Sequence, residues 1–130
     1  MTQIETPNRI NRQWLKRNTG PAFTLVVFGE EFLTVVAALS WASIHGPGAV
    51  SRRHGAYAHQ RIVAALPLGA PELTLHRSEL MALVDGLEHI IRFPHYTRYA
   101  MNILDIIRRG AEQYKQMQSS RQTVSHCDEL

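Results

Sequence analysis

Cysteine is almost absent from this sequence. The one thiol among 130 residues belongs to Cys127, close to the C-terminal end. A single thiol excludes a framework of internal disulfides and favours a reducing compartment, so we expect a cytoplasmic protein. The adjacent His126 does not turn Cys127 into a convincing nucleophile, because neighbouring residues near a chain end rarely hold the geometry that thiolate activation requires.

Long hydrophobic runs are missing as well. The longest apolar stretch, over residues 32–44, is about thirteen residues long and is interrupted by Thr34, Ser40 and Ser43. A helix that spans a bilayer needs about 20 apolar residues. The first seventeen residues are polar and lack the apolar segment of a secretory leader. The final CDEL resembles an endoplasmic-reticulum retrieval signal, but without a leader this match indicates chance. We therefore expect no membrane partner.

The short motifs of the best-known chemistries are also absent. No phosphate-binding glycine loop follows residues 22–28, and there is no Gly-x-Ser-x-Gly sequence. His54 and His59 are five residues apart, whereas helical metal pairs are spaced by four, and no Cys-x-x-Cys occurs. No pair of carboxylates stands out for acid–base work. We predict no catalytic residue, no cofactor and no metal, and we favour a binding or regulatory protein over an enzyme.

Acidic residues are missing from one segment in particular, residues 45–61. This segment holds three arginines, three histidines and a tyrosine, in a chain of net charge +3 in which twelve of the fourteen basic residues are arginine. Arginine carries a planar fork of donors that suits phosphate and carboxylate, and it stacks on rings and bases. An arginine-rich codon usage would give the same bias, so composition alone does not identify a partner.

The pattern of apolar residues predicts a single, predominantly helical α+β domain. Four helices and one or two short strands are expected. The strands fall at 22–28 and 72–76, and the helices at 30–43, 56–66, 78–93 and 96–117, with Ser78 as an N-cap. Residues 45–54 are expected to form a loop and 67–71 a turn. The domain is predicted to cover 1–118, followed by a flexible tail at 119–130.

An internal echo links residues 24–39 with residues 74–87. Each begins with Thr-Leu and continues into a similar helix, EFLTVVAAL from Glu31 and ELMALVDGL from Glu79. Of these nine aligned positions, three are identical and four others are apolar or small in both copies. A strand–helix unit used twice would explain the echo, but any two amphipathic helices also look alike.

The helix expected at 30–43 is apolar on nearly every side. A helix of this kind is central in its domain, or it places one face against a partner chain. Because two further amphipathic helices compete for one small core, we predict a homo-oligomer, in the simplest case a homodimer.

Basic and aromatic residues supply the candidate site. Cations near rings suit a nucleic-acid surface, because phosphates take the charge and bases stack on the rings. The same residue types are favoured where a protein meets an acidic partner protein, so an adaptor or inhibitor is the alternative. A small enzyme with a histidine-centred site in the same segment is the second alternative. The candidate binding residues are Arg52, Arg53, His54, Tyr57, His59, Arg61, Arg98, Arg108 and Arg109.

Overall fold

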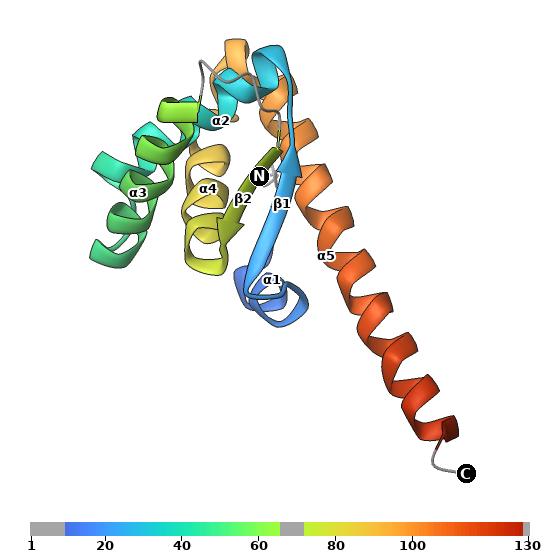
Figure 1. Ribbon diagram of the computed structural model, residues 1–130. Helices are drawn as coiled ribbons and strands as arrows, with labels where there is room; N and C mark the ends of the chain where they lie inside the picture. The colour runs from blue at the N-terminus through green and yellow to red at the C-terminus, as the bar shows by residue number, and fades with distance from the viewer. Residues whose placement is uncertain (1–9, 66–71, 129–130) are drawn as a thin grey trace, which may run out of the picture.

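A computed structural model describes residues 10–65 and 72–128, of which residues 121–128 are described by their backbone alone (Figure 1). The fold is the predicted α+β domain, predominantly helical. Over the described residues it contains five helices and two strands. In chain order these are α1 (Arg12–Asn18), β1 (Ala22–Val26), α2 (Gly29–His45), α3 (Ala49–Ala65), β2 (Glu72–His76), α4 (Arg77–Ile90) and α5 (Pro94–Asp128).

A strand followed by two helices occurs twice in succession. β1 leads into α2 and α3, and β2 leads into α4 and α5. The two strands pair antiparallel with Thr24 opposite Thr74, and they form a two-stranded sheet that we call the ribbon. In Figure 1, α3 and α5 flank the ribbon on opposite sides, and α4 lies between α3 and the ribbon.

Two contacts join residues that correspond in the sequence echo. Thr24 corresponds to Thr74, and these residues face one another in the ribbon, where the antiparallel pair has a local two-fold axis. Ala38 corresponds to Gly86, and α2 and α4 make a close contact at this pair. A strand followed by a helix therefore occurs twice, with a longer turn before α2 than before α4.

The ribbon buries one face. The side chains of Leu25, Leu73 and Leu75 point inward and are almost fully buried, whereas the residues between them are exposed. This alternation follows from the two-residue period of a strand. Phe23 packs over α5, where a β-carbon at Gly110 would lie 2.6 Å from its ring.

Glycine allows the helices beneath the ribbon to approach closely. A β-carbon added to Gly86 would stand 2.1 Å from the carbonyl oxygen of Ala38. At Gly55 it would stand 3.1 Å from the β-carbon of Ala42, where α3 packs on α2. Gly29 has a different role: its φ of 54° makes the left-handed turn from the first strand into α2.

Several predicted boundaries were wrong. A loop was expected at 45–54, but the connection consists only of residues 46–48. Helix α2 continues to His45, and α3 begins at Ala49. The N-cap of α4 is His76 rather than Ser78. Helix α1 was not predicted, because its seven residues bury only Leu15 and leave little periodic signal. Helix α5 runs from Pro94 to Asp128, whereas the helix was predicted at 96–117. The flexible tail at 119–130 stays a prediction. The turn predicted at 67–71 lies outside the described residues.

The predicted homodimer stays a prediction. Helix α2 buries Val35, Ala38 and Leu39 within the chain, so part of its apolar surface needs no partner. Leu33 and Ile44 on the same helix remain exposed, by 52% and 65%.

Candidate nucleic-acid interface

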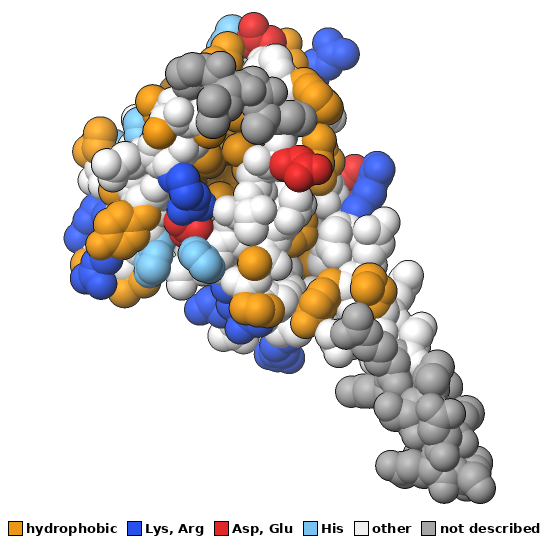
Figure 2. Space-filling view, in the orientation of Figure 1, with side chains coloured by type: hydrophobic (Ala, Val, Ile, Leu, Met, Phe, Trp, Pro, Cys, Tyr) orange, Lys and Arg blue, Asp and Glu red, His pale blue; other side chains and the backbone are white. Residues whose placement is uncertain are grey.

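The outer face of the ribbon has threonine at its centre and a longer polar side chain at each end. It consists of three exposed residues from each strand, in the facing pairs Ala22 with His76, Thr24 with Thr74, and Val26 with Glu72. We call these six residues the ribbon face. Figure 2 views this side of the molecule, with acid at one end of the ribbon and basic side chains over α1, over α3 and at the upper right. The centre of the ribbon face is thus uncharged, and both basic and acidic side chains lie around it in this view.

A buried ion pair holds the ribbon to the helices. The Glu79 carboxylate is 2% exposed and accepts two hydrogen bonds from the Arg61 guanidinium, at 2.7 and 3.0 Å. The same guanidinium donates to the carbonyl oxygen of Thr74 at 2.9 Å. The backbone N–H of His76 donates to Glu79 at 2.9 Å. Arg61 on α3 therefore connects β2 with the start of α4.

These contacts fix the charge state of Glu79. Burial alone would raise the pKa of its carboxyl group, but the hydrogen bonds from Arg61 and from the His76 N–H, together with the Arg61 charge, outweigh it. The net effect is a pKa below the ordinary value, so Glu79 is a carboxylate at neutral pH.

A second ion pair attaches the N-terminal helix. Arg12 on α1 donates from Nε to Asp85 at 2.6 Å and from Nη2 to Glu88 at 2.8 Å. The Ser51 hydroxyl donates to the other oxygen of Asp85 at 3.0 Å, and the Ile10 N–H donates to Glu88 at 3.1 Å. No sequence motif links Arg12 to Asp85 or Glu88, and the fold brings the three side chains together.

The predicted binding residues fall into two groups, those with a protein partner and those without. Arg61 is engaged by Glu79, and Arg52 donates to the Gly46 carbonyl at 3.0 Å, which ties α3 to the preceding turn. Arg108 and Arg109 lie 3.8 and 2.5 Å from Asp105 on their own helix. The charge of these arginines is therefore partly used inside the chain.

Arg53 and Arg98 form the second group. Both are exposed, and neither makes a hydrogen bond or ion pair within the described part of the chain. Arg53 is the fifth residue of α3, counted from Ala49, and Arg98 is the fifth residue of α5, counted from Pro94. Each arginine thus lies in the second turn of its helix.

The aromatic and imidazole candidates lie along α3. Tyr57 is 55% exposed, and its ring meets the His54 ring edge-on at a centroid distance of 6.0 Å. His59 is half-buried and lies two residues beyond Tyr57, on a different face of the helix. The fold therefore brings His54, Tyr57 and His59 together on one helix, whereas Arg98, Arg108 and Arg109 lie on α5.

A separate cluster of rings joins α2 to α4. Trp41 stacks on His89 at 4.2 Å, and His89 meets Phe93 at 5.6 Å. Burial lowers the pKa of the His89 imidazole, and the positive charges of Arg92 and His45 lower it further. The neutral form of His89 is therefore the one that the folded chain favours.

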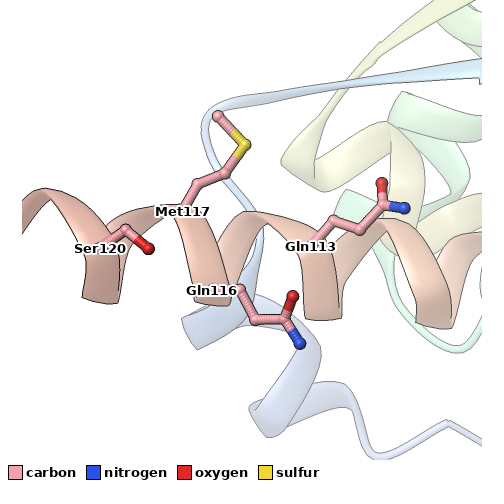
Figure 3. Close-up of a pocket in the computed structure, with 4 residues that line it drawn as sticks. All are labelled: Gln113, Gln116, Met117 and Ser120. Carbon is pink, nitrogen blue, oxygen red and sulfur yellow. The ribbon is translucent and has the colours of Figure 1, made fainter.

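Cavities and metal-binding clusters give no stronger candidate. A hollow along α5 is lined by Gln113, Gln116, Met117 and Ser120, all from one helix and none of them titratable (Figure 3). Within residues 10–65 and 72–128, no three His, Cys, Asp or Glu side chains are grouped to hold a metal ion. No helix in the same ranges is both long and apolar enough to cross a bilayer.

Sequence reasoning missed the ribbon face. Its signal was the alternation of ELTLH and the Thr-Leu echo, which together predict two similar strands with threonine on the outer face. A scan against protein-family models, a search of curated proteins and a search of solved structures each found no match.

Proposed function

We propose that the protein binds double-stranded DNA, with the ribbon face in the major groove and arginines of the two halves on the flanking phosphates. The observation that carries the proposal is an exposed two-stranded antiparallel ribbon with threonine at its centre, flanked by helices that carry exposed arginines. The major groove is about 12 Å wide and admits a two-stranded β-ribbon.

The size of the ribbon suits this groove. Five residues per strand extend for about 17 Å at roughly 3.4 Å per residue. Phosphates along one DNA strand repeat at about 3.4 Å, so the ribbon matches a few successive base pairs. Threonine at the centre of each strand can donate to or accept from base edges.

Phosphate contact is assigned to Arg53 and Arg98. Their charge is not consumed by a carboxylate of the described chain, and they lie on helices that flank the ribbon from opposite sides. A groove is bordered by two phosphate backbones, so one arginine from each half is a matching arrangement. Arg61 is assigned to supporting β2, because Glu79 neutralises it.

DNA is favoured over duplex RNA by the same geometry. The major groove of an A-form RNA helix is deep and narrow, and side chains do not read it. The ribbon face has no exposed aromatic residue on which unpaired bases would stack. An acidic protein partner remains the second candidate, because exposed arginine and tyrosine on α3 would suit it equally.

The test is a titration of fluorescently labelled duplex DNA of random sequence, followed by anisotropy between about 50 and 200 mM salt. We expect binding that weakens as salt rises. Arg53→Ala and Arg98→Ala should each reduce the log–log salt slope by about one, because each removes one phosphate contact. Lys115→Ala removes the same charge from an exposed position farther along α5 and should leave the slope unchanged.

Three outcomes would count against the proposal. Absence of binding to duplex DNA at low salt would refute it. Equal binding of duplex RNA would contradict insertion of the ribbon into the major groove, because side chains do not read that groove in RNA. If DNA does not bind and an acidic protein is retained from nuclease-treated extract in an Arg53- and Arg98-dependent manner, the protein-binding alternative would replace it.

A further inference from the structure

The two ends of the ribbon face are chemically unequal. The local two-fold axis of the antiparallel ribbon passes between Thr24 and Thr74, so the centre of the face is the same in both strands. One end pairs Val26 with Glu72, and the other pairs Ala22 with His76. All four of these residues are exposed. The symmetry of the backbone is therefore not shared by the side chains that the ribbon presents.

The two strands carry different residues at two pairs of corresponding positions. Within the strands, Ala22 corresponds to Glu72 and Val26 corresponds to His76, as the pairing register requires. β1 thus exposes Ala-Thr-Val, whereas β2 exposes Glu-Thr-His. A dimer of identical chains has identical halves, which match a palindromic site. Here one chain supplies both halves, so each strand carries its own side chains.

Each end of the face suits different base edges. A glutamate in the major groove accepts a hydrogen bond from the N4 amino group of cytosine, and a valine contacts the thymine methyl group. The imidazole N–H of His76 suits the N7 and O6 acceptors of guanine. Glu72 also disfavours the wrong bases, because a carboxylate that faces guanine or thymine acceptors is left unpaired and desolvated.

We propose that one chain reads one non-palindromic duplex site in a single orientation, with the Val26–Glu72 end over a cytosine-containing step and the Ala22–His76 end over a guanine-containing step. This inference rests on the proposed function and specifies its ligand. A second copy is not needed to complete the ribbon. Reversal of the site relative to the chain costs affinity, because it exchanges the bases that Glu72 and His76 face.

The experiment compares consensus sites selected from a random duplex library. The double variant Glu72→Ala with His76→Val gives β2 the same exposed residues as β1. The reciprocal variant Ala22→Glu with Val26→His gives β1 those of β2. Lys115→Ala serves as a control with an unaltered ribbon. Circular dichroism and thermal denaturation of all four proteins establish that the variants are folded.

We expect a non-palindromic consensus for the wild type and for Lys115→Ala, and a palindromic consensus for each symmetrised variant. Exchange of the cytosine under Glu72 should weaken wild-type binding about tenfold or more, and should not affect the variant that lacks Glu72. A palindromic wild-type consensus, or an asymmetric consensus that persists in both folded symmetrised variants, would overturn this inference while leaving DNA binding intact. No binding to any duplex would overturn the proposed function and the inference with it.

Discussion

Gly86 on α4 and Ala38 on α2 approach so closely that a β-carbon at position 86 would lie 2.1 Å from the Ala38 carbonyl oxygen. The contact is with backbone, which cannot rotate away as the end of a side chain can. The packing of α2 on α4 beneath the ribbon therefore requires a residue without a β-carbon at position 86.

Gly86→Ala is expected to destabilise the fold by about 3 kcal/mol, because the two helices must separate and lose packing around the contact. For a chain of this size the melting temperature should fall by about 10 °C. Gly48→Ala is the matched control, since a β-carbon there meets no atom within 4 Å. Similar melting temperatures for the two variants would contradict the close approach.

Arg61→Met is expected to destabilise the protein at pH 7 because it leaves the Glu79 carboxylate buried without its partner. Loss of one member of a buried pair costs about 3–5 kcal/mol, and the half-exposed arginine places this case near the lower end. Adding Glu79→Gln removes the charge and keeps an oxygen for the His76 N–H, so the double variant should be more stable than Arg61→Met. Urea denaturation measures both. A double variant no more stable than the single one would show that the unpaired charge is not the cause.

Glu79 should also contribute to acid sensitivity. The pKa of its carboxyl is below the ordinary value of 4.5 in the folded chain, so the folded state releases this proton more readily than the unfolded state does. The stabilisation is fully present above pH 4.5 and is lost as the pH falls through the folded-state pKa. The difference in unfolding free energy between wild type and Glu79→Gln should therefore shrink below pH 4.5. All other carboxylates are present in both proteins, so their titration does not contribute to this difference. A difference that stays constant with pH would refute this role.

His89 titration is expected to respond to its stacking partner. Burial is the first cause of its lowered pKa, so Trp41→Ala should move the pKa upward toward the ordinary value of 6.5. Arg92→Met should move it in the same direction by relieving a positive charge. NMR of the imidazole protons measures both shifts. In the wild type, stability should fall as the pH drops below 6.5, because the unfolded state takes up this proton first. An unchanged pKa in both variants would contradict the assignment.

Deletion of residues 120–130 should leave the melting temperature nearly unchanged. This part of α5 projects beyond the rest of the molecule in Figure 1. Preceding positions such as Lys115, Gln116 and Met117 are already exposed. The ellipticity at 222 nm (roughly proportional to helix content) should fall, because helical residues are removed. A fall of several degrees in melting temperature would mean that the segment docks against the domain.

The fold class and both strands could be predicted from the sequence, since ELTLH alternates cleanly and AFTLV is β-branched and apolar. The pairing of the strands could not, because a register between residues 50 positions apart has no local signal. The first residues of α3 were predicted as a loop because Arg52, Arg53 and His54 show no apolar stripe. In the structure α3 packs on α2 through Gly55 and Ala58, and such small residues carry little hydrophobic signal.

The candidate binding residues stay a prediction, and their surroundings could not be read from the sequence. The exposed arginines are visible in composition, but the partners that occupy Arg61 and Arg52 come from distant or backbone atoms. Thr24, Glu72 and His76 belong to no motif in the sequence. They form one surface only because β1 and β2 pair.

The pairing of Thr24 with Thr74 also sets an order of assembly. The helical hairpin of α2 and α3 brings together residues close in sequence, whereas the ribbon must close a loop that contains the whole of that hairpin. Contacts between distant residues carry a larger loop-closure entropy and form later in folding. We expect the nascent chain to lack a ribbon until β2 has been synthesised. A fragment that ends before Glu72 would keep Arg53 but would have no ribbon face.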